Sequence, residues 1–412
     1  MTSSTQLDLK TLESLTQGEA VAIRGRATLE PAGGPGDKVF PPSHMIDKGA
    51  RDPGAKYAFE TRIIDGARTD CVLLDSVQSQ ANRMEEALQA LWADKRIALP
   101  VIGVDFTAVA PDVGVVTSLS APHRVADAIL RDSLLDGKLF RYSETGKSFT
   151  DATARNAAPL FRVCPTGLVF GIWDSTGPKG GLGSKFARAL ISEIVGVGVV
   201  FGAKTSSRID PTGIVTKAAD VLQAADPAEG WTLDAAAAAK DAKGVPLKKG
   251  DGKVSEVNHS NVPPTVDRLG GGATIDHAMH TVVLSLAALR KLSFGADSDA
   301  ARTVLSALGI LAILAAESRG HDLRSRCLLV PRPGHALKLE AVKRDGSTLP
   351  LTIDLDQAIA LYSAAVNALP DGLKFKSKPG EPLASLTPSP KLVHLVQKSR
   401  ELASTGTEIE ES

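Results

Sequence analysis

The stretch from Gly177 to Arg188 has the composition of an anion-binding turn, with four glycines and Lys179 among its residues. An apolar run, Leu168–Trp173, precedes it and predicts a strand, and a helix with Ser184 as its N-cap is predicted to come after it. A glycine-rich turn before a helix N-terminus presents free backbone N–H groups, which bind phosphate and other anions. Phosphate binding is therefore the chemistry that this stretch predicts.

Two cations, Lys185 and Arg188, fall in the first turn of that predicted helix, where the helix dipole disfavours positive charge. A bound phosphate would offset this placement, so both residues are candidate phosphate contacts. A flexible surface turn with solvated charges is the alternative interpretation. The order Gly-Ser-Lys excludes a nucleotide triphosphatase loop, because a Walker A motif needs Gly-Lys-Ser or Gly-Lys-Thr.

A second short segment, Lys204–Arg208, comes after a predicted apolar strand, Val197–Phe201. It places hydroxyl side chains, Ser206 among them, between two cations. Such a combination suits a nucleic-acid backbone, because hydroxyl groups add hydrogen bonds to the point charges. A solvated loop is an equally compatible interpretation.

A polar helix is predicted from Asp75, which would cap it together with Gln78 in a variant of the capping box. Its predicted buried stripe comprises Val77, Ala81, Met84, Leu88 and Leu91. Its predicted polar face comprises Gln78, Asn82, Glu85 and Gln89. The amides of this helix can contact sugar, phosphate or base edges, and a plain solvent-facing surface is the alternative.

Two histidines, His277 and His280, stand three residues apart and invite a metal-site interpretation. If the segment is a strand, the two side chains point to opposite faces of the sheet. We therefore predict a structural role and no metal site, with metal binding as the alternative. The preceding segment Asn258–Pro264 predicts a rigid polar turn.

Motifs of the common enzyme classes are missing from the sequence, including the Gly-x-Ser-x-Gly elbow, His-Glu-x-x-His and the Rossmann fingerprint. The usual RNA-recognition strand motif is also missing. Aromatic residues make up 4% of the chain, which argues against a broad stacking platform and favours contacts to a nucleic-acid backbone. We predict a protein that is not an enzyme and uses no cofactor.

The formal net charge is zero, so any affinity for nucleic acid must come from a local patch. Between residues 138 and 208, ten lysines and arginines stand against four acidic residues. Cys71, Cys164 and Cys327 lack a Cys-x-x-Cys spacing, which argues against disulfides or a thiolate zinc site and suits a reducing compartment. The longest apolar run, Leu308–Ala316, is too short to cross a bilayer, and the polar first residues resemble no signal peptide. We expect a cytoplasmic protein that does not bind membranes.

Strands and helices alternate without a regular βα rhythm, which favours an α+β fold with an antiparallel sheet covered by helices on one face. The clearest predicted elements are a strand from Ala20, a short helix within 122–132, a buried helix over 299–319, a strand over 327–330, a hairpin over 337–353 and a last helix around Tyr362. The predicted organisation is a polar lead (1–18), a body (19–390) with a flexible insertion (218–253), and an acidic tail (391–412) that frays.

Several of these segments together resemble one family. The segments that carry the resemblance are Leu29–Pro31, Lys38–Pro42, Leu74–Glu85, Phe170–Ser175, Ser206–Pro211 and Glu256–Pro264. In this order they resemble the CRISPR-associated RAMP-superfamily backbone subunit of type I-U (also called I-G) Cascade complexes, the Csb-one branch of the Cas-seven proteins. The likeness runs from about Glu19 to Leu369.

The resemblance implies a modified RNA-recognition (ferredoxin-like) palm with helical finger insertions and an extended thumb loop. It implies that copies assemble head to tail along the CRISPR RNA and present it for pairing with target DNA. Other Cascade subunits and a separate nuclease-helicase would be the further partners. Whether the thumb lies in the insertion or in the long loop Glu30–Tyr57 stays open.

Carried over by motif, the residues expected along the RNA are Gln78, Asn82, Arg83, Lys179, Lys185, Arg188, Lys204, Ser206 and Arg208. Asn258, His259 and Asn261 are expected to meet the RNA or a neighbouring subunit. One alternative is an RNA-cleaving backbone subunit of the type III kind, with Asp174 and Asp210 as the candidate aspartates. Another is an enzyme that binds a phosphorylated small molecule at the Gly177–Arg188 turn.

Overall fold

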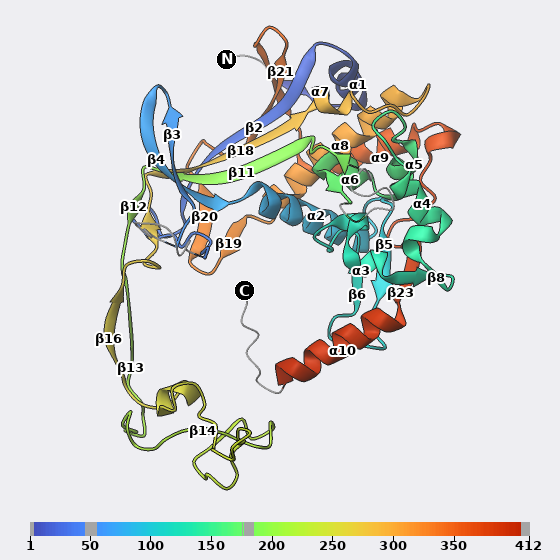
Figure 1. The fold of residues 1–412 in the computed structure, drawn as a ribbon. Helices are drawn as coiled ribbons and strands as arrows, with labels where there is room; N and C mark the ends of the chain where they lie inside the picture. The colour runs from blue at the N-terminus through green and yellow to red at the C-terminus, as the bar shows by residue number, and fades with distance from the viewer. Residues whose placement is uncertain (1–3, 46–55, 175, 177–184, 405–412) are drawn as a thin grey trace. The chain divides into compact units, whose positions relative to one another are not determined.

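The computed structural model describes residues 4–45, 56–174, 176 and 185–404 (Figure 1). The chain divides into two compact units. Unit 1 comprises Met1–His44, Tyr57–Val200 and Ala273–Ser389, and unit 2 comprises Met45–Lys56, Phe201–Gly272 and Pro390–Ser412. The chain leaves unit 1 through β12 (Val200–Phe201) and re-enters it at β17 (Ala273–Thr274).

Unit 1 is built on a ten-stranded sheet in which only the short pairing of β1 with β22 is parallel, among the described residues. The strands in spatial order are β1 (Thr5–Gln6), β22 (Thr348–Thr352), β21 (Lys338–Lys343), β2 (Ala20–Pro31), β18 (His277–Ser285), β11 (Leu190–Val197), β4 (Ala67–Asp75) and β3 (Phe59–Ile64). Two more strands, β19 (His321–Arg324) and β20 (Cys327–Pro331), join through β2. The long central strands β2, β18 and β11 lie side by side in Figure 1.

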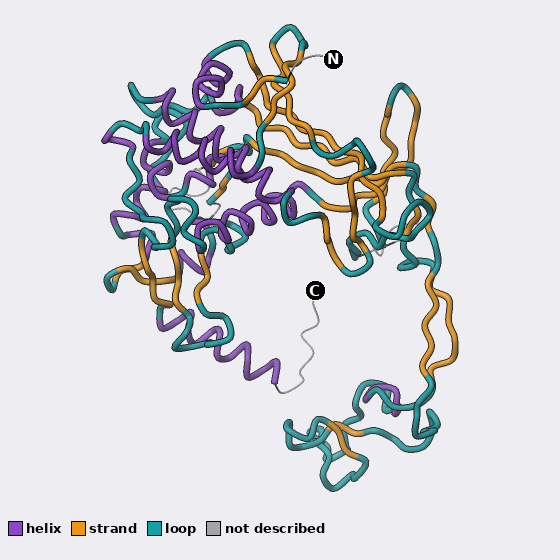
Figure 2. The backbone as a smooth tube through the Cα atoms, turned by 180° about the vertical axis from the view of Figure 1, so that it is seen from behind, coloured by secondary structure: helices purple, strands orange, loops and turns teal. Residues whose placement is uncertain are grey.

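One face of the sheet contributes side chains to the core. Along β18 every second side chain is buried, from Ala278 through His280 and Val282 to Leu284. Helices pack on this sheet (Figure 2). They are α1 (Leu9–Gln17), α2 (Val77–Ala93), α6 (Pro165–Phe170), α7 (Leu286–Leu289) and α8 (Ser298–Glu317), and α9 (Leu355–Asn367) packs on α8. The predicted α+β class with an antiparallel sheet is confirmed.

Helix α8 is the centre of unit 1, where it contacts α1, α2, α6, α7 and α9 as well as β18. Its side chains are apolar almost all round and thirteen of them are buried, which confirms the predicted core helix. Among the described residues, this helix alone is long and apolar enough to cross a membrane, and most of it is buried inside the protein. It ends at Glu317, and Gly320, whose φ is +73°, turns the chain toward β19.

A smaller sheet in unit 1 has the order β6–β5–β23–β7–β8. Its strands are β6 (Val115–Thr117), β5 (Ile102–Asp105), β23 (Ala384–Pro388), β7 (Ser133–Leu135) and β8 (Lys138–Leu139). The short helices near it are α3 (Ala128–Arg131), α4 (Glu144–Thr150) and α5 (Ala158–Val163). The single helix predicted over 122–132 is a 3₁₀ turn, Arg124–Ala126, followed by α3.

Unit 2 contains an exposed two-stranded ribbon, β13 (Lys204–Arg208) paired antiparallel with β16 (Val262–Asp267). The chain between these strands includes β14 (Leu222–Gln223), β15 (Trp231–Thr232) and a 3₁₀ turn, Val254–Val257. The insertion predicted over 218–253 is exposed at most positions and buries few residues, Val221 among them. The tail that was expected to fray is helical over α10 (Pro390–Ser404).

Candidate nucleic-acid interface

A groove of about 600 Å³ lies on unit 1, between the first turns of α2, residues 122–131 and the strands β9 (Ile172–Trp173) and β10 (Lys185–Phe186). It brings together four of the residues expected along the RNA, Gln78, Asn82, Lys185 and Arg188, and the candidate aspartate Asp174 also lines it. His123, Arg131 and Trp173 also line it, and the sequence did not single these out as contacts. Its lining combines amides, cations and one indole ring.

Helix α2 presents the amides of Gln78 and Asn82 to this groove because its other face is buried. The N-cap is Ser76, whose hydroxyl accepts from the Ser79 N–H at 3.2 Å, so the predicted cap at Asp75 is wrong by one residue. Ala81, Met84, Leu88 and Leu91 are buried as predicted, whereas Val77, also predicted to be buried, is only partly so. Gln78 and Asn82, four residues apart, therefore share the exposed face.

Glu85 was expected on that polar face, and this expectation is wrong because its side chain is buried. Arg124 donates to both of its carboxylate oxygens, at 2.7 and 2.6 Å, and also donates to the Gly171 carbonyl oxygen at 3.1 Å. Burial raises the pKa of Glu85 above its usual range, while Arg124 acts in the opposite direction. This buried ion pair joins α2 to the opposite wall of the groove.

The helix expected after the glycine-rich stretch, with its N-cap at Ser184, is wrong, because Lys185 and Phe186 form strand β10. They pair with Trp173 and Ile172 of β9, and the strand predicted over Leu168–Trp173 is instead helix α6 followed by β9. Gly177–Ser184, including Lys179, lies outside the described residues. Lys185 therefore does not lie at a helix N-terminus that could bind phosphate through the helix dipole, but in a two-residue strand.

Trp173 and Lys185 face each other across this ladder and form a cation–π contact, with the Lys185 ammonium 5.2 Å from the ring centroid. Trp173 is 58% exposed, which is unusual for so large an apolar side chain. An exposed indole beside a cation at the rim of a groove offers both a stacking surface and a charge.

Arg188 contributes to the groove and also holds it together. Its guanidinium donates to the Val77 carbonyl oxygen at 2.9 Å, which ties the segment before β11 to the start of α2. Burial lowers its pKa, and the nearby Arg124 lowers it further. Part of its role is therefore structural.

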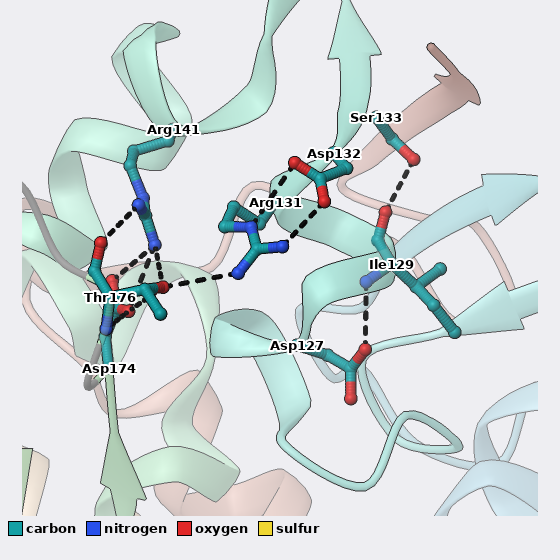
Figure 3. A network of polar contacts seen from close by, with 8 residues as sticks. All are labelled: Asp127, Ile129, Arg131, Asp132, Ser133, Arg141, Asp174 and Thr176. Atoms are coloured by element: carbon teal, nitrogen blue, oxygen red, sulfur yellow. Dashed lines mark hydrogen bonds and ion pairs between the residues drawn. The ribbon is translucent and has the colours of Figure 1, made fainter. Parts of the chain in front are cut away.

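Asp174, one of the two candidate catalytic aspartates, is buried in a polar network (Figure 3). Its carboxylate accepts two hydrogen bonds from Arg141, at 2.8 and 3.0 Å, and one from the Thr176 N–H at 3.0 Å. Arg131, which pairs with Asp132 at 2.7 Å, also donates to the Thr176 hydroxyl. These contacts occupy the Asp174 oxygens and anchor the chain where it leaves β9.

Arg83 was expected along the RNA with Gln78 and Asn82, but it does not line the groove. Its guanidinium donates to the fully buried Asp75 at 3.0 Å and to the carbonyl oxygen of Leu323. Arg324 also donates to Asp75, at 3.2 Å. Arg83 thus joins α2 to β19.

The other predicted contacts form a second group in unit 2, along the ribbon. Lys204 pairs with Asp267 at 3.4 Å, and the Ser206 hydroxyl hydrogen-bonds to that of Thr265 at 2.8 Å. Arg208 donates twice to the Ser260 carbonyl oxygen, at 2.7 and 3.1 Å. Lys204 and Ser206 remain exposed, whereas Arg208 is partly engaged in holding the end of the ribbon.

The second candidate aspartate, Asp210, lies at that end of the ribbon and is also occupied. Its carboxylate accepts from the N–H groups of Thr212 and Ser260, each at 2.8 Å, and its own N–H donates to Asn261 at 2.7 Å. Among its neighbours, His259 lies 3.8 Å away and is half exposed, and Asn258 has a left-handed φ of +58°. Asp210 thus closes the predicted polar turn, which ends at Asn261, because Val262–Pro264 belong to strand β16.

Hydrogen bonds from Thr212, and then from Ser260, lower the pKa of Asp210 to about 2. A carboxylate whose pKa is lower in the folded protein stabilises the fold at pH values above its pKa in the unfolded chain, 3.8. That stabilisation is lost as the pH falls toward 2. We expect Asp210→Asn to loosen this turn at neutral pH and to remove its acid-dependent opening, as monitored by hydrogen exchange at Ser260. Asp345→Asn, at a surface turn of unit 1, is the control and should leave Ser260 unchanged.

The fold and groove define an α+β protein with an antiparallel sheet and a polar, partly basic groove on its first unit. Residues 23–201 match the family model described as CRISPR-associated protein GSU0053. The resemblance to a CRISPR-associated family is thereby confirmed over the part of the chain that supplies the groove. The match does not extend to the ribbon strand β13 or to β16.

No curated protein matches this chain. Among solved structures, the crystal structure of Thermofilum pendens Csc2 is similar at 8% sequence identity, with a TM-score of 0.29. That alignment covers 96% of this chain and 80% of the other. At this score the likeness carries no argument about the fold.

Proposed function

We propose that this protein is a CRISPR RNA-binding backbone subunit of a type I interference (Cascade) complex, of the type I-U kind. Copies would assemble head to tail along the guide RNA and present it for pairing with target DNA. The observation that carries the proposal is the match of residues 23–201 to a CRISPR-associated family. Those residues supply Gln78, Asn82, Trp173 and Lys185 to one groove.

The chemistry of the groove supports binding to the RNA backbone. Amides such as Gln78 and Asn82 donate to phosphate and ribose oxygens, and Lys185 neutralises phosphate charge. Contacts of this kind position a strand without reading its bases, so that guide pairing supplies the sequence specificity. A subunit repeated along one RNA needs such sequence-independent contacts.

We assign the parts of the family fold to the two units of this chain. The large sheet of unit 1 is the palm, and the helical segments inserted between its strands are the fingers. The exposed ribbon of unit 2, β13 and β16 with the chain between them, is the thumb. The exposed Lys204 and Ser206 would then contact RNA from the thumb, and Asn258 and His259 would meet RNA or the next copy.

A structural role without catalysis is part of the proposal. Asp174 and Asp210, the candidates for cleavage of bound RNA, each have carboxylate oxygens engaged by neighbouring donors. An aspartate held in this way is poorly placed to bind a catalytic metal ion or activate water. The small-molecule enzyme loses its main support, because Lys185 opens no helix.

Cleavage would fall to a separate nuclease-helicase that joins the assembled complex in the cytoplasm, and other Cascade subunits would cap the filament. The test is co-expression of the protein with a CRISPR array, followed by absorbance and sequencing of the nucleic acid that co-purifies. We expect a large assembly that protects RNA of one repeat-spacer unit. A monomer free of RNA at low salt would contradict the proposal.

Replacing Lys185 with Ala should weaken RNA binding and flatten its salt dependence. Each phosphate neutralised on a single strand contributes roughly 0.7 to the slope of log K against log salt, so one lost contact should lower the slope by about that amount. Lys147→Ala is the matched control, because Lys147 is exposed, pairs with Glu144 and does not line the groove. Equal slopes for the two variants would remove Lys185 from the RNA path.

A further inference from the structure

Three side chains with metal-ligating atoms converge inside unit 1, on a face of α2 other than the groove face. They are His280 from β18, Glu317 from the last turn of α8 and His321 from the first position of β19. The Glu317 oxygens lie 3.2 Å from His280 Nδ1 and 3.6 Å from His321 Nε2. All three ligand atoms lie within 4.8 Å of one another, and both histidines are buried.

A chain of hydrogen bonds determines which nitrogen of His280 carries the proton. The Asp75 carboxylate accepts hydrogen bonds from Arg83 and Arg324, and it also accepts from Gln80 Nε2 at 2.7 Å. The amide oxygen of Gln80 must therefore be an acceptor, and it receives the Ser192 hydroxyl at 2.8 Å.

Ser192 has only one hydroxyl hydrogen, and Gln80 takes it. The 2.8 Å contact between Ser192 Oγ and His280 Nε2 is then a hydrogen bond in which Nε2–H donates. A neutral His280 consequently carries its lone pair on Nδ1, which is buried and has no hydrogen-bond partner. That lone pair faces a carboxylate oxygen of Glu317 at 3.2 Å.

An acceptor nitrogen and a carboxylate oxygen that face each other in a buried site are well placed to bind a cation between them. His321 faces the other oxygen of the same carboxylate, and the two imidazole rings lie edge to face with centroids 5.4 Å apart. A single metal ion would bind the lone pair of each ring in its neutral form together with the carboxylate.

We propose that His280 Nδ1, Glu317 and His321 Nε2 bind one Zn²⁺ ion. Two histidines and one glutamate are a known zinc ligand set, and bonds of about 2.0–2.1 Å in a tetrahedron separate ligand atoms by roughly 3.4 Å. The two distances to Glu317 lie on either side of that value. The Nε2–H of His280, donated to Ser192, is the outer-shell contact that zinc-binding histidines normally make.

A cavity of about 280 Å³ adjoins the site and leaves room for a water molecule at the fourth position. Glu317 and His321 line it together with Gln80, Arg83 and Asp322. The ion would join the central strand β18 to the end of the core helix α8 and the start of β19, which follow each other closely in sequence but lie far from β18. This proposed site does not depend on the proposed function.

The test is metal analysis of the full-length, untagged protein, loaded with Zn²⁺ and freed of excess metal by gel filtration. We expect about one Zn²⁺ per chain for the wild type and a several-fold loss for His280→Gln and Glu317→Gln. His277→Gln is the matched control, because His277 lies on the same strand beside the exposed carboxylate of Asp276 and should keep the ion. Co²⁺ should give the visible absorption bands of a tetrahedral site in the wild type and in the control.

A readout on the wild type alone keeps the proposal testable if the site variants misfold. Chelation should lower the Tm of the wild type, and added Zn²⁺ should restore it. Wild-type protein without bound metal, whose Tm is indifferent to chelator, would overturn the proposal. Equal metal content in the wild type and folded site variants would overturn it as well.

Discussion

Arg124→Met is expected to lower the free energy of unfolding by about 3–5 kcal/mol, because it leaves Glu85 buried without its counter-charge. Arg124 is held within the protein by both oxygens of Glu85 and by the Gly171 carbonyl oxygen, which loses its donor as well. The loss should also disturb the groove, since this pair joins α2 to the wall that carries Trp173. Urea unfolding with two independent probes measures the effect.

The variant should also have a characteristic pH dependence. Burial already raises the pKa of Glu85, and loss of Arg124 would raise it further. A group whose pKa is higher in the folded protein than in the unfolded chain favours the folded state most at pH values below its pKa in the unfolded chain. The loss in free energy of unfolding caused by Arg124→Met should therefore grow as the pH rises toward neutrality. Adding Glu85→Gln should recover part of the stability at neutral pH and abolish this dependence.

The control for Arg124→Met is Arg131→Met. Arg131 pairs with Asp132 at 2.7 Å, but both side chains are partly exposed, and pairs of this kind contribute about 0–1 kcal/mol. If the two variants lose similar stability, burial of the Glu85–Arg124 pair does not have the expected energetic weight.

Trp173→Ala is expected to weaken binding of single-stranded RNA by about 1–3 kcal/mol, or about 5- to 150-fold, if the groove binds RNA as proposed. The ring is 58% exposed at the groove, and Lys185 lies 5.2 Å from its centroid. A nucleotide stacked on the ring would bring a phosphate within reach of that ammonium group. Fluorescence anisotropy with a labelled guide RNA measures the change.

Trp173→Phe should retain most of the affinity, because a smaller ring still stacks. Tyr142→Ala removes a similarly exposed ring, 61% exposed, that does not line the groove, and should leave binding unchanged. Equal losses for Trp173→Ala and Tyr142→Ala would exclude a specific stacking contact at Trp173.

Local pattern predicted much of the fold correctly. The α+β class, the core helix α8 and the hairpin of β21 and β22 follow from apolar periodicity and from the turn at Asp345-Gly346, which depend on neighbours a few residues apart. The shared face of Gln78 and Asn82 follows from helical geometry alone. These features were predictable because each is determined within one element.

The predictions from sequence were wrong at residues whose conformation or burial depends on a partner that is distant in sequence. Glu85 has the spacing of a solvent-facing residue, and only Arg124, 39 residues later, makes its burial tolerable. Lys185 has the spacing of a helix start, but pairing with Trp173 makes it a strand. Arg83 lies next to Asn82 in sequence, yet it turns toward Asp75 and β19.

His277 and His280 show what the sequence determines by itself and what only the tertiary structure decides. Strand periodicity alone determined that His277 and His280 face opposite ways, and the structure confirms it, with His277 beside Asp276 and His280 buried. Only the tertiary structure brought Glu317 and His321 to His280, because the turn at Gly320 and the sheet order place the end of α8 and the start of β19 over β18. A sequence determines the faces of its elements through local geometry, but which faces meet is decided by the packing of the whole core.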